Sequence, residues 1–218
     1  MRGKLWLTRI VATALGTVVA AQLWAFPDVA RQTKSACASC HVNPAGGADL
    51  TDGGKAWKAE SKAPAAAAKA AEYVGNNKCK MCHIKQHKAW AETQHFKAFT
   101  NLQSAESAPA ESMAAKLKVE LKAKPATMDA CVRCHVTGFQ LAGGYPAADS
   151  AKTAAVAMVG CESCHGPGSL HVSAPMAEKK KMINRAATGM CKQCHTAETS
   201  PKFDMEWAKK VHPIKTEG

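Results

Sequence analysis

The sequence predicts an all-α, loop-rich fold of short helices with little β-structure, and three observations lead to this expectation. No stretch long enough for a strand alternates apolar and polar residues. Large apolar side chains are scarce, with five Phe, two Tyr and five Trp in 218 residues, so a conventional apolar core could not form. All ten cysteines belong to five copies of a Cys-x-x-Cys-His pentad, whose spacing suits one face of a helical turn.

Each pentad places a histidine directly after the second of two thiols. Such thiols can reach the vinyl groups of one porphyrin and form thioethers, and the histidine then becomes the proximal iron ligand. We therefore predict five covalently attached c-type haems. The attaching cysteines are Cys37, Cys40, Cys79, Cys82, Cys131, Cys134, Cys161, Cys164, Cys191 and Cys194, and the proximal ligands are His41, His83, His135, His165 and His195.

Zinc sites and disulfides explain the pentads less well. A zinc site combines two Cys-x-x-Cys pairs, or one pair with two histidines, and does not need a histidine after every pair. Disulfide frameworks show no such uniform spacing. With haem in every pentad, the haems themselves must form the core, and short helices and loops must wrap around them closely. We expect the chain without haem to be largely unfolded.

The N-terminus predicts export, because residues 1–25 read as a signal peptide. Arg2, Lys4 and Arg9 precede an apolar stretch over residues 10–21, and small residues follow as cleavage points. An uncleaved membrane anchor is the alternative, although the apolar run is short for a spanning helix. Since bacteria attach c-type haems outside the cytoplasm, we expect a periplasmic protein, with the cell surface or the exterior as the alternative.

The rest of the chain divides into three parts. Residues 26–60 predict a one-haem module, in which residues 43–47 and 52–54 form tight glycine-rich turns. Residues 61–72 are alanine-rich and predict a semi-rigid linker that is helical in part. Residues 73–218 hold the other four pentads.

Prolines delimit three further helices in the four-haem part. We predict an amphipathic helix over residues 110–122, a second helix over residues 176–187 and a short terminal helix over residues 206–211.

The basic composition does not predict nucleic-acid binding. The formal charge is +12, and loss of Arg2, Lys4 and Arg9 with the leader lowers it to +9. Each haem brings a pair of propionate groups, so five haems offset this surplus roughly completely. The lysines at 179–181 could form a docking patch, and a solvated helix face is the alternative reading.

Sequence around the last four pentads goes beyond bare haem attachment. The second pentad is followed by a W-x-x-T-x-H pattern of Trp90, Thr93 and His95, and the third is followed by the stretches 136–139 and 143–145. The fourth pentad lies within the stretch 159–171, and the fifth is followed by residues 200–203 and His212. Together these stretches resemble the tetrahaem cytochrome c-554 family, first known from nitrifying bacteria. The pentad at 37–41 is an addition to that pattern.

The resemblance implies an exported electron carrier with closely packed haem pairs. It also implies that His95, His171 and His212 are sixth ligands, and that the haem on Cys131 and Cys134 has an open iron. Related tetrahaem proteins build extracellular filaments, and the same haem packing occurs in larger enzymes of nitrogen metabolism.

The histidine count leaves one iron short of a sixth ligand. Nine histidines less the five proximal ones leave His87, His95, His171 and His212. A methionine such as Met182 or Met205, an open iron, or a histidine of a neighbouring subunit could complete the count. His87 follows His83 by four residues on one helical face, where it is either a ligand or a partly exposed helix histidine. Residues 26–78 contain no methionine and no histidine besides His41.

The favoured function is electron transfer to redox partner proteins, among them other multihaem cytochromes, by hopping along the haems. A small nitrogen-oxide reductase with an open haem iron is one alternative. A filament subunit, or another homo-oligomer, is the second, since a neighbour could supply the missing histidine.

Overall fold

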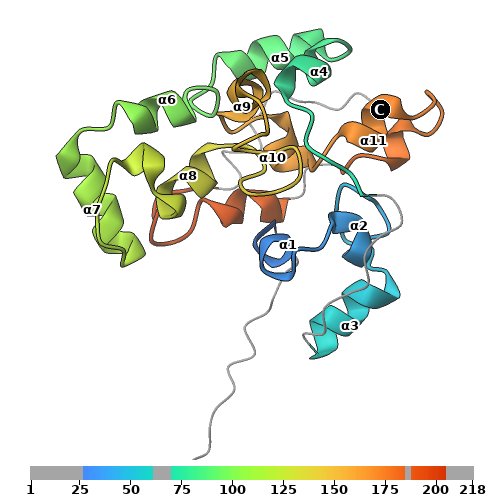
Figure 1. Cartoon of the computed structure of the whole chain (residues 1–218), viewed down its shortest axis with the longest axis horizontal. Helices are drawn as coiled ribbons and strands as arrows, with labels where there is room; N and C mark the ends of the chain where they lie inside the picture. Colours follow the sequence, from blue (N-terminus) through green and yellow to red (C-terminus); the bar gives the residue numbers. More distant parts are fainter. Residues whose placement is uncertain (1–26, 61–69, 185–187, 205–218) are drawn as a thin grey trace, which may run out of the picture.

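The described part of the chain is helical and rich in loops. The structure is a computed structural model that describes residues 27–60, 70–184 and 188–204 (Figure 1). These residues form eleven α-helices and three 3-10 helices and no strand; an isolated antiparallel bridge joins His41 and Leu50. The all-α, loop-rich prediction is thereby confirmed. The helices are α1 (Pro27–Thr33), α2 (Cys37–Cys40), α3 (Asp52–Glu60), α4 (Asn76–Lys80), α5 (Ile84–Ala91), α6 (Ala98–Gln103), α7 (Ser107–Leu117), η1 (Pro125–Thr127), α8 (Asp129–His135), α9 (Ser150–Val156), α10 (Cys161–His165), α11 (Ser169–Ser173), η2 (Lys179–Lys181) and η3 (Thr188–Gln193).

Helix α7 differs from the predicted helix over 110–122 at both ends. It starts at Ser107, so Pro109 lies within its first turn, where the missing N–H breaks no helical hydrogen bond. It ends at Leu117 because Lys118 adopts a left-handed conformation, with φ of 55°. The predicted helix over 206–211 lies outside the described residues.

The predicted helix over 176–187 is wrong in its described part, which is a turn followed by η2. Tertiary hydrogen bonds fold this segment back onto α11. The Nζ of Lys179 donates to the carbonyls of His171 and Val172, at 2.9 and 2.8 Å, and the Lys179 carbonyl lies 2.8 Å from His171 Nδ1. These contacts also engage Lys179 within the fold, and Lys181 pairs with Glu178 at 3.0 Å.

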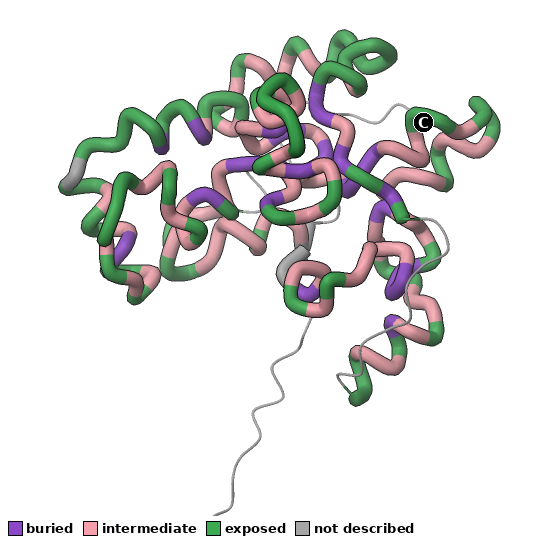
Figure 2. The backbone as a smooth tube through the Cα atoms, viewed as in Figure 1, coloured by how far each residue is buried: buried purple, intermediate pink, exposed green. Residues whose placement is uncertain are grey.

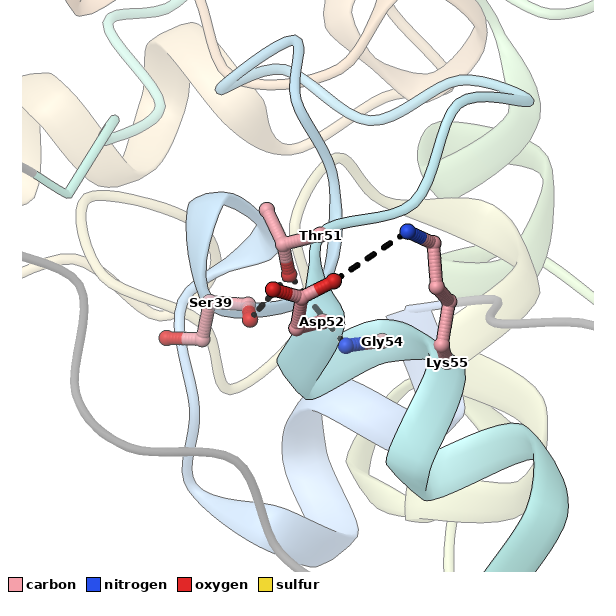
Figure 3. A network of polar contacts seen from close by, with 5 residues as sticks. All are labelled: Ser39, Thr51, Asp52, Gly54 and Lys55. Atoms are coloured by element: carbon pink, nitrogen blue, oxygen red, sulfur yellow. Dashed lines mark hydrogen bonds and ion pairs between the residues drawn. The ribbon is translucent and has the colours of Figure 1, made fainter.

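The second predicted glycine turn, at 52–54, is also wrong, because these residues begin helix α3. Thr51 caps this helix: its Oγ1 accepts from the Gly54 N–H at 3.2 Å and donates to the Ser39 carbonyl at 2.9 Å (Figure 3). A Cβ at position 54 would overlap the Cys40 carbonyl oxygen. The glycine therefore lets α3 pack directly against α2.

The apolar core is small, as the scarcity of large apolar residues predicts. One cluster joins α6 to α8 and consists of Phe99, Leu102, Val132, Val136 and Phe139. Elsewhere the buried residues form short stretches between exposed ones (Figure 2). Among the described residues, no helix is long and apolar enough to cross a membrane.

Candidate haem sites

All five pentads form helical turns. They lie on α2, on α4 and the turn after it, on α8, on α10 and on η3. In three of them the histidine N–H donates to the carbonyl of the first cysteine at 2.9 Å, as in His41 to Cys37, His83 to Cys79 and His195 to Cys191. Each pentad thus presents its thiols and its imidazole from one turn. No disulfide joins any of the ten cysteines, all of which lie within the described residues.

The last four pentads lie side by side in an order that differs from their order in the sequence. The thiols of Cys79 and Cys161 are hydrogen-bonded, and so are those of Cys134 and Cys194. Helix α10, which carries the fourth pentad, packs against η3, which carries the first cysteine of the fifth pentad, and against α4 of the second. The pentads therefore follow one another in space as 79–83, 161–165, 191–195 and 131–135.

Glu162, inside the fourth pentad, ties it to the segment before α4. The side chain is 2% exposed, and its carboxylate accepts from the N–H groups of Val74, Gly75 and Gly168 at 2.7–3.1 Å. Burial raises the pKa of Glu162, while these N–H groups lower it by a smaller amount. A carboxylate between two attaching cysteines therefore acts as a structural bridge, a role that the sequence analysis missed.

Asn76 and Thr137 make two more ties that the sequence analysis missed. Asn76 Oδ1 accepts from the Cys161 N–H at 2.9 Å, and its Nδ2 donates to the Ala155 carbonyl at 3.2 Å. Thr137 Oγ1 accepts from the Gly160 N–H at 2.9 Å and donates to the Met158 carbonyl at 2.6 Å. Both residues hold the start of α10, so the fourth pentad is fixed to the second and the third. The glycines around the fourth pentad were the available signal, since they allow this close approach.

Several histidine rings are oriented through Nδ1. His135 Nδ1 lies 2.8 Å from the Ala98 carbonyl, and His165 Nδ1 lies 2.9 Å from the Asn184 carbonyl. His195 Nδ1 lies 2.9 Å from Ser200 Oγ. A proton on Nδ1 leaves Nε2 unprotonated, and this tautomer with an oriented ring is what metal-ligating histidines adopt. His171 is held in the same way by Lys179.

Two spare histidines face proximal ones at the spacing of axial ligands. The ring centres of His83 and His171 are 6.2 Å apart, and those of His95 and His195 are 6.1 Å apart. A metal–imidazole bond is about 2.0 Å and the ring centre lies roughly 1.2 Å behind the nitrogen, so two imidazoles across one metal ion have centres about 6.4 Å apart. In both pairs the separation of the ring centres is close to that of two imidazoles on one metal ion.

The other spare histidines are placed differently. The His87 ring lies against Trp90, with ring centres 5.1 Å apart, and burial lowers its pKa. His212 lies outside the described residues, as does Met205. Among the described residues, no second histidine ring pairs with His135 or His165.

The surface around His83 fits a porphyrin. Cys82 and His83 are exposed, and the apolar side chains of Met81, Ile84 and Val172 beside them are 71%, 64% and 42% exposed. Apolar groups gathered around attaching thiols and a proximal imidazole are the surroundings that a flat macrocycle would cover. The fourth pentad is more enclosed, since burial raises the pKa of the Cys164 thiol to about 11.

Part of this chain is similar to known cytochromes. The family described as "Cytochrome c554 and c-prime" matches residues 78–166. Cytochrome c-554 of Nitrosomonas europaea is 44% identical over 100 residues, which are 45% of this chain and 40% of the relative. The chain thus matches about two fifths of that relative's length. The solved reduced state of cytochrome c554 from the same organism covers 66% of this chain and 84% of its own, with 27% identity and a TM-score of 0.48.

The matched region contains the pentads at 79–83, 131–135 and 161–165 and the bridging residue Glu162. Residues 78–166 of this chain are therefore similar to the family described as "Cytochrome c554 and c-prime" and to cytochrome c-554 of Nitrosomonas europaea.

Proposed function

We propose that this protein is an exported cytochrome that carries electrons through five covalently attached c-type haems. The observation that carries the proposal is the proximity of four pentads: Cys79 lies beside Cys161, α10 packs against η3, and Cys194 lies beside Cys134. Cofactors attached to pentads that lie this close to one another would be close neighbours. Haem supplies one-electron redox chemistry when bound, and the protein sets its spacing, axial ligation and burial.

The axial ligands follow from the ring pairs. His171 would be the sixth ligand of the iron bound by His83, and His95 would be the sixth ligand of the iron bound by His195. The two ring separations near 6 Å support this assignment. A coordinatively full iron passes electrons without binding a substrate. His212 remains our proposed ligand for a further iron from the family resemblance, and His87 remains a candidate.

The site of action and the partners follow from the sequence. The predicted signal peptide over residues 1–25 supports an exported protein, periplasmic in the first instance. Redox partner proteins, including other multihaem cytochromes, are the proposed partners. Because propionates offset the basic side chains, nucleic acid is not among them.

Three measurements on the purified holoprotein test the proposal. Intact mass should show five haems, and potentiometric titration should show five one-electron steps within one molecule. Quantitative EPR of the fully oxidised protein then counts open irons, and low-spin signals from every haem are the result expected of a pure carrier. A high-spin iron that binds and reduces nitric oxide, nitrite or hydroxylamine would favour an enzyme instead.

A further inference from the structure

The N-terminal segment, residues 27–60, packs onto the four-pentad part of the chain. Asn43 Nδ2 donates to the Ile183 carbonyl at 3.0 Å. Arg31 Nη1 donates to the Phe139 carbonyl at 3.2 Å, and its guanidinium lies 6.0 Å from the centre of the Phe139 ring. These contacts place α1 and the loop after α2 on two different surfaces of the larger part.

The contact is closest where the glycine-rich loop meets the residue after the fourth pentad. Ala45 is 4% exposed, and a Cβ at Gly166 would overlap the Ala45 carbonyl oxygen. Gly166 also has φ of +77°, a conformation that side chains other than glycine adopt at a cost. The backbones of the two parts therefore touch here, with no side chain between them.

A cavity lies at this contact, and its wall comes from both parts. Cys37, Cys40 and His41 line it from the N-terminal pentad. Gly166 and Pro167, which directly follow His165, line it from the fourth pentad, together with Asn184, whose carbonyl holds the His165 ring.

Met190, which directly precedes Cys191, lines the same cavity. Hence one cavity is lined both by the attaching cysteines of the first pentad and by residues next to the fourth and fifth pentads. Those two pentads lie between 79–83 and 131–135 in the spatial series, since α10 packs against α4 and η3, and Cys194 lies beside Cys134.

We infer that the N-terminal pentad joins the haem series at its middle, as a branch, and gives the cytochrome a third electron port. This inference rests on the proposed electron-transfer function. An electron that enters at His41 reaches the fourth or the fifth pentad first and can leave toward either end. The outer face of the N-terminal pentad is accessible, since Val42, next to His41, is 67% exposed.

The substitution Ala45→Arg tests the branch, and Ala48→Arg is its matched control. Both place the same charged side chain in the same loop, but Ala45 is buried against Gly166 whereas Ala48 is exposed. Hydrogen exchange of the holoprotein reports docking. We expect Ala45→Arg to raise exchange in residues 43–47 and at Gly166, and we expect Ala48→Arg to match the wild type.

Pulse radiolysis that delivers less than one electron per molecule reports electron sharing. In the wild type and in Ala48→Arg, the electron should distribute over all haems in fast unimolecular phases. In Ala45→Arg, one haem should equilibrate more slowly by roughly tenfold or more, because its site is no longer held beside the others.

Three results would overturn the branch. The first is a haem that already equilibrates slowly in the wild type. The second is unchanged equilibration in an Ala45→Arg protein that has undocked. The third is unchanged exchange at Gly166 in that variant. If the protein lacks haem by intact mass, or its haems exchange no electrons at all, the electron-carrier proposal itself fails, which is a different outcome from any of these three.

Discussion

The imidazole rings of His83 and His171 lie 6.2 Å apart, with their planes inclined by 26°. The two residues come from different elements, since His83 precedes α5 and His171 lies on α11. Hydrogen bonds between His171 and Lys179 fix the second ring in place. The separation suits a single iron bound between the rings, and the arrangement survives only if α11 stays next to the second pentad.

Replacing His171 by glycine should open the iron of His83. We expect one haem of the oxidised holoprotein to change from low-spin to high-spin, because the sixth ligand is lost. Quantitative EPR would measure the change, and added imidazole should reverse it. Ser173→Ala, at an exposed position on the same helix, is the control and should leave every haem low-spin. An unchanged spectrum of the His171 variant would show that another residue ligates this iron.

Ser200 should tune the potential of one haem through His195. Its Oγ lies 2.9 Å from His195 Nδ1, and the Phe203 ring stacks on the same imidazole at 4.4 Å. Without this acceptor the imidazole donates less electron density to the iron, so oxidised iron is stabilised less.

We therefore expect Ser200→Ala to raise the reduction potential of one haem by roughly tens of millivolts and to leave the others in place. Spectroelectrochemical titration would resolve the shift. Ser200→Thr keeps a hydroxyl and should restore the original potential. A uniform shift of all haems would indicate a general structural change instead.

The sequence predicts the chemistry of the sites better than their arrangement. The attaching cysteines and proximal histidines stay predictions from the pentads, and they can be predicted because this chemistry depends on neighbouring residues within one helical turn. The spatial order of the pentads depends on buried side chains that act over long distances in the chain, such as Glu162 and Asn76, and no local pattern marks them. The predicted helix over 176–187 failed for the same reason, since Lys179 bonds back to α11.

Glu162→Ala should destabilise the holoprotein by a few kcal/mol. The N–H groups of Val74, Gly75 and Gly168 would lose their acceptor, and a buried unsatisfied donor costs about 1–3 kcal/mol. Denaturant unfolding would measure the loss. The matched control is Glu178→Ala, at a more exposed glutamate paired with Lys181, which should cost at most about 1 kcal/mol. Equal effects of the two substitutions would contradict the bridging role.

The same carboxyl should make stability depend on pH in a defined direction. Burial raises the folded-state pKa of Glu162 above its ordinary value near 4.5. At pH values between the ordinary pKa and the folded-state pKa, the folded protein therefore binds more protons than the unfolded protein. The contribution of this carboxyl to stability is fully present below the ordinary value and falls as pH rises through the folded pKa. The difference in unfolding free energy between wild type and Glu162→Gln should therefore shrink as pH rises across this window, as unfolding at a series of pH values would show. A difference that grows with pH would contradict the raised pKa.

Removing the haems should unfold most of the chain. The largest apolar cluster among the described residues has five buried members, Phe99, Leu102, Val132, Val136 and Phe139, which is too small to offset the conformational entropy of the whole chain.

A protein in which serine replaces every pentad cysteine should therefore lose most of its helical circular-dichroism signal and show no cooperative thermal transition. The haem-loaded wild type, prepared in parallel, provides the control and should melt cooperatively. If the haem-free chain melted in one sharp transition, the polypeptide ties through Asn76, Thr137 and Glu162 would have to suffice for folding without the cofactors.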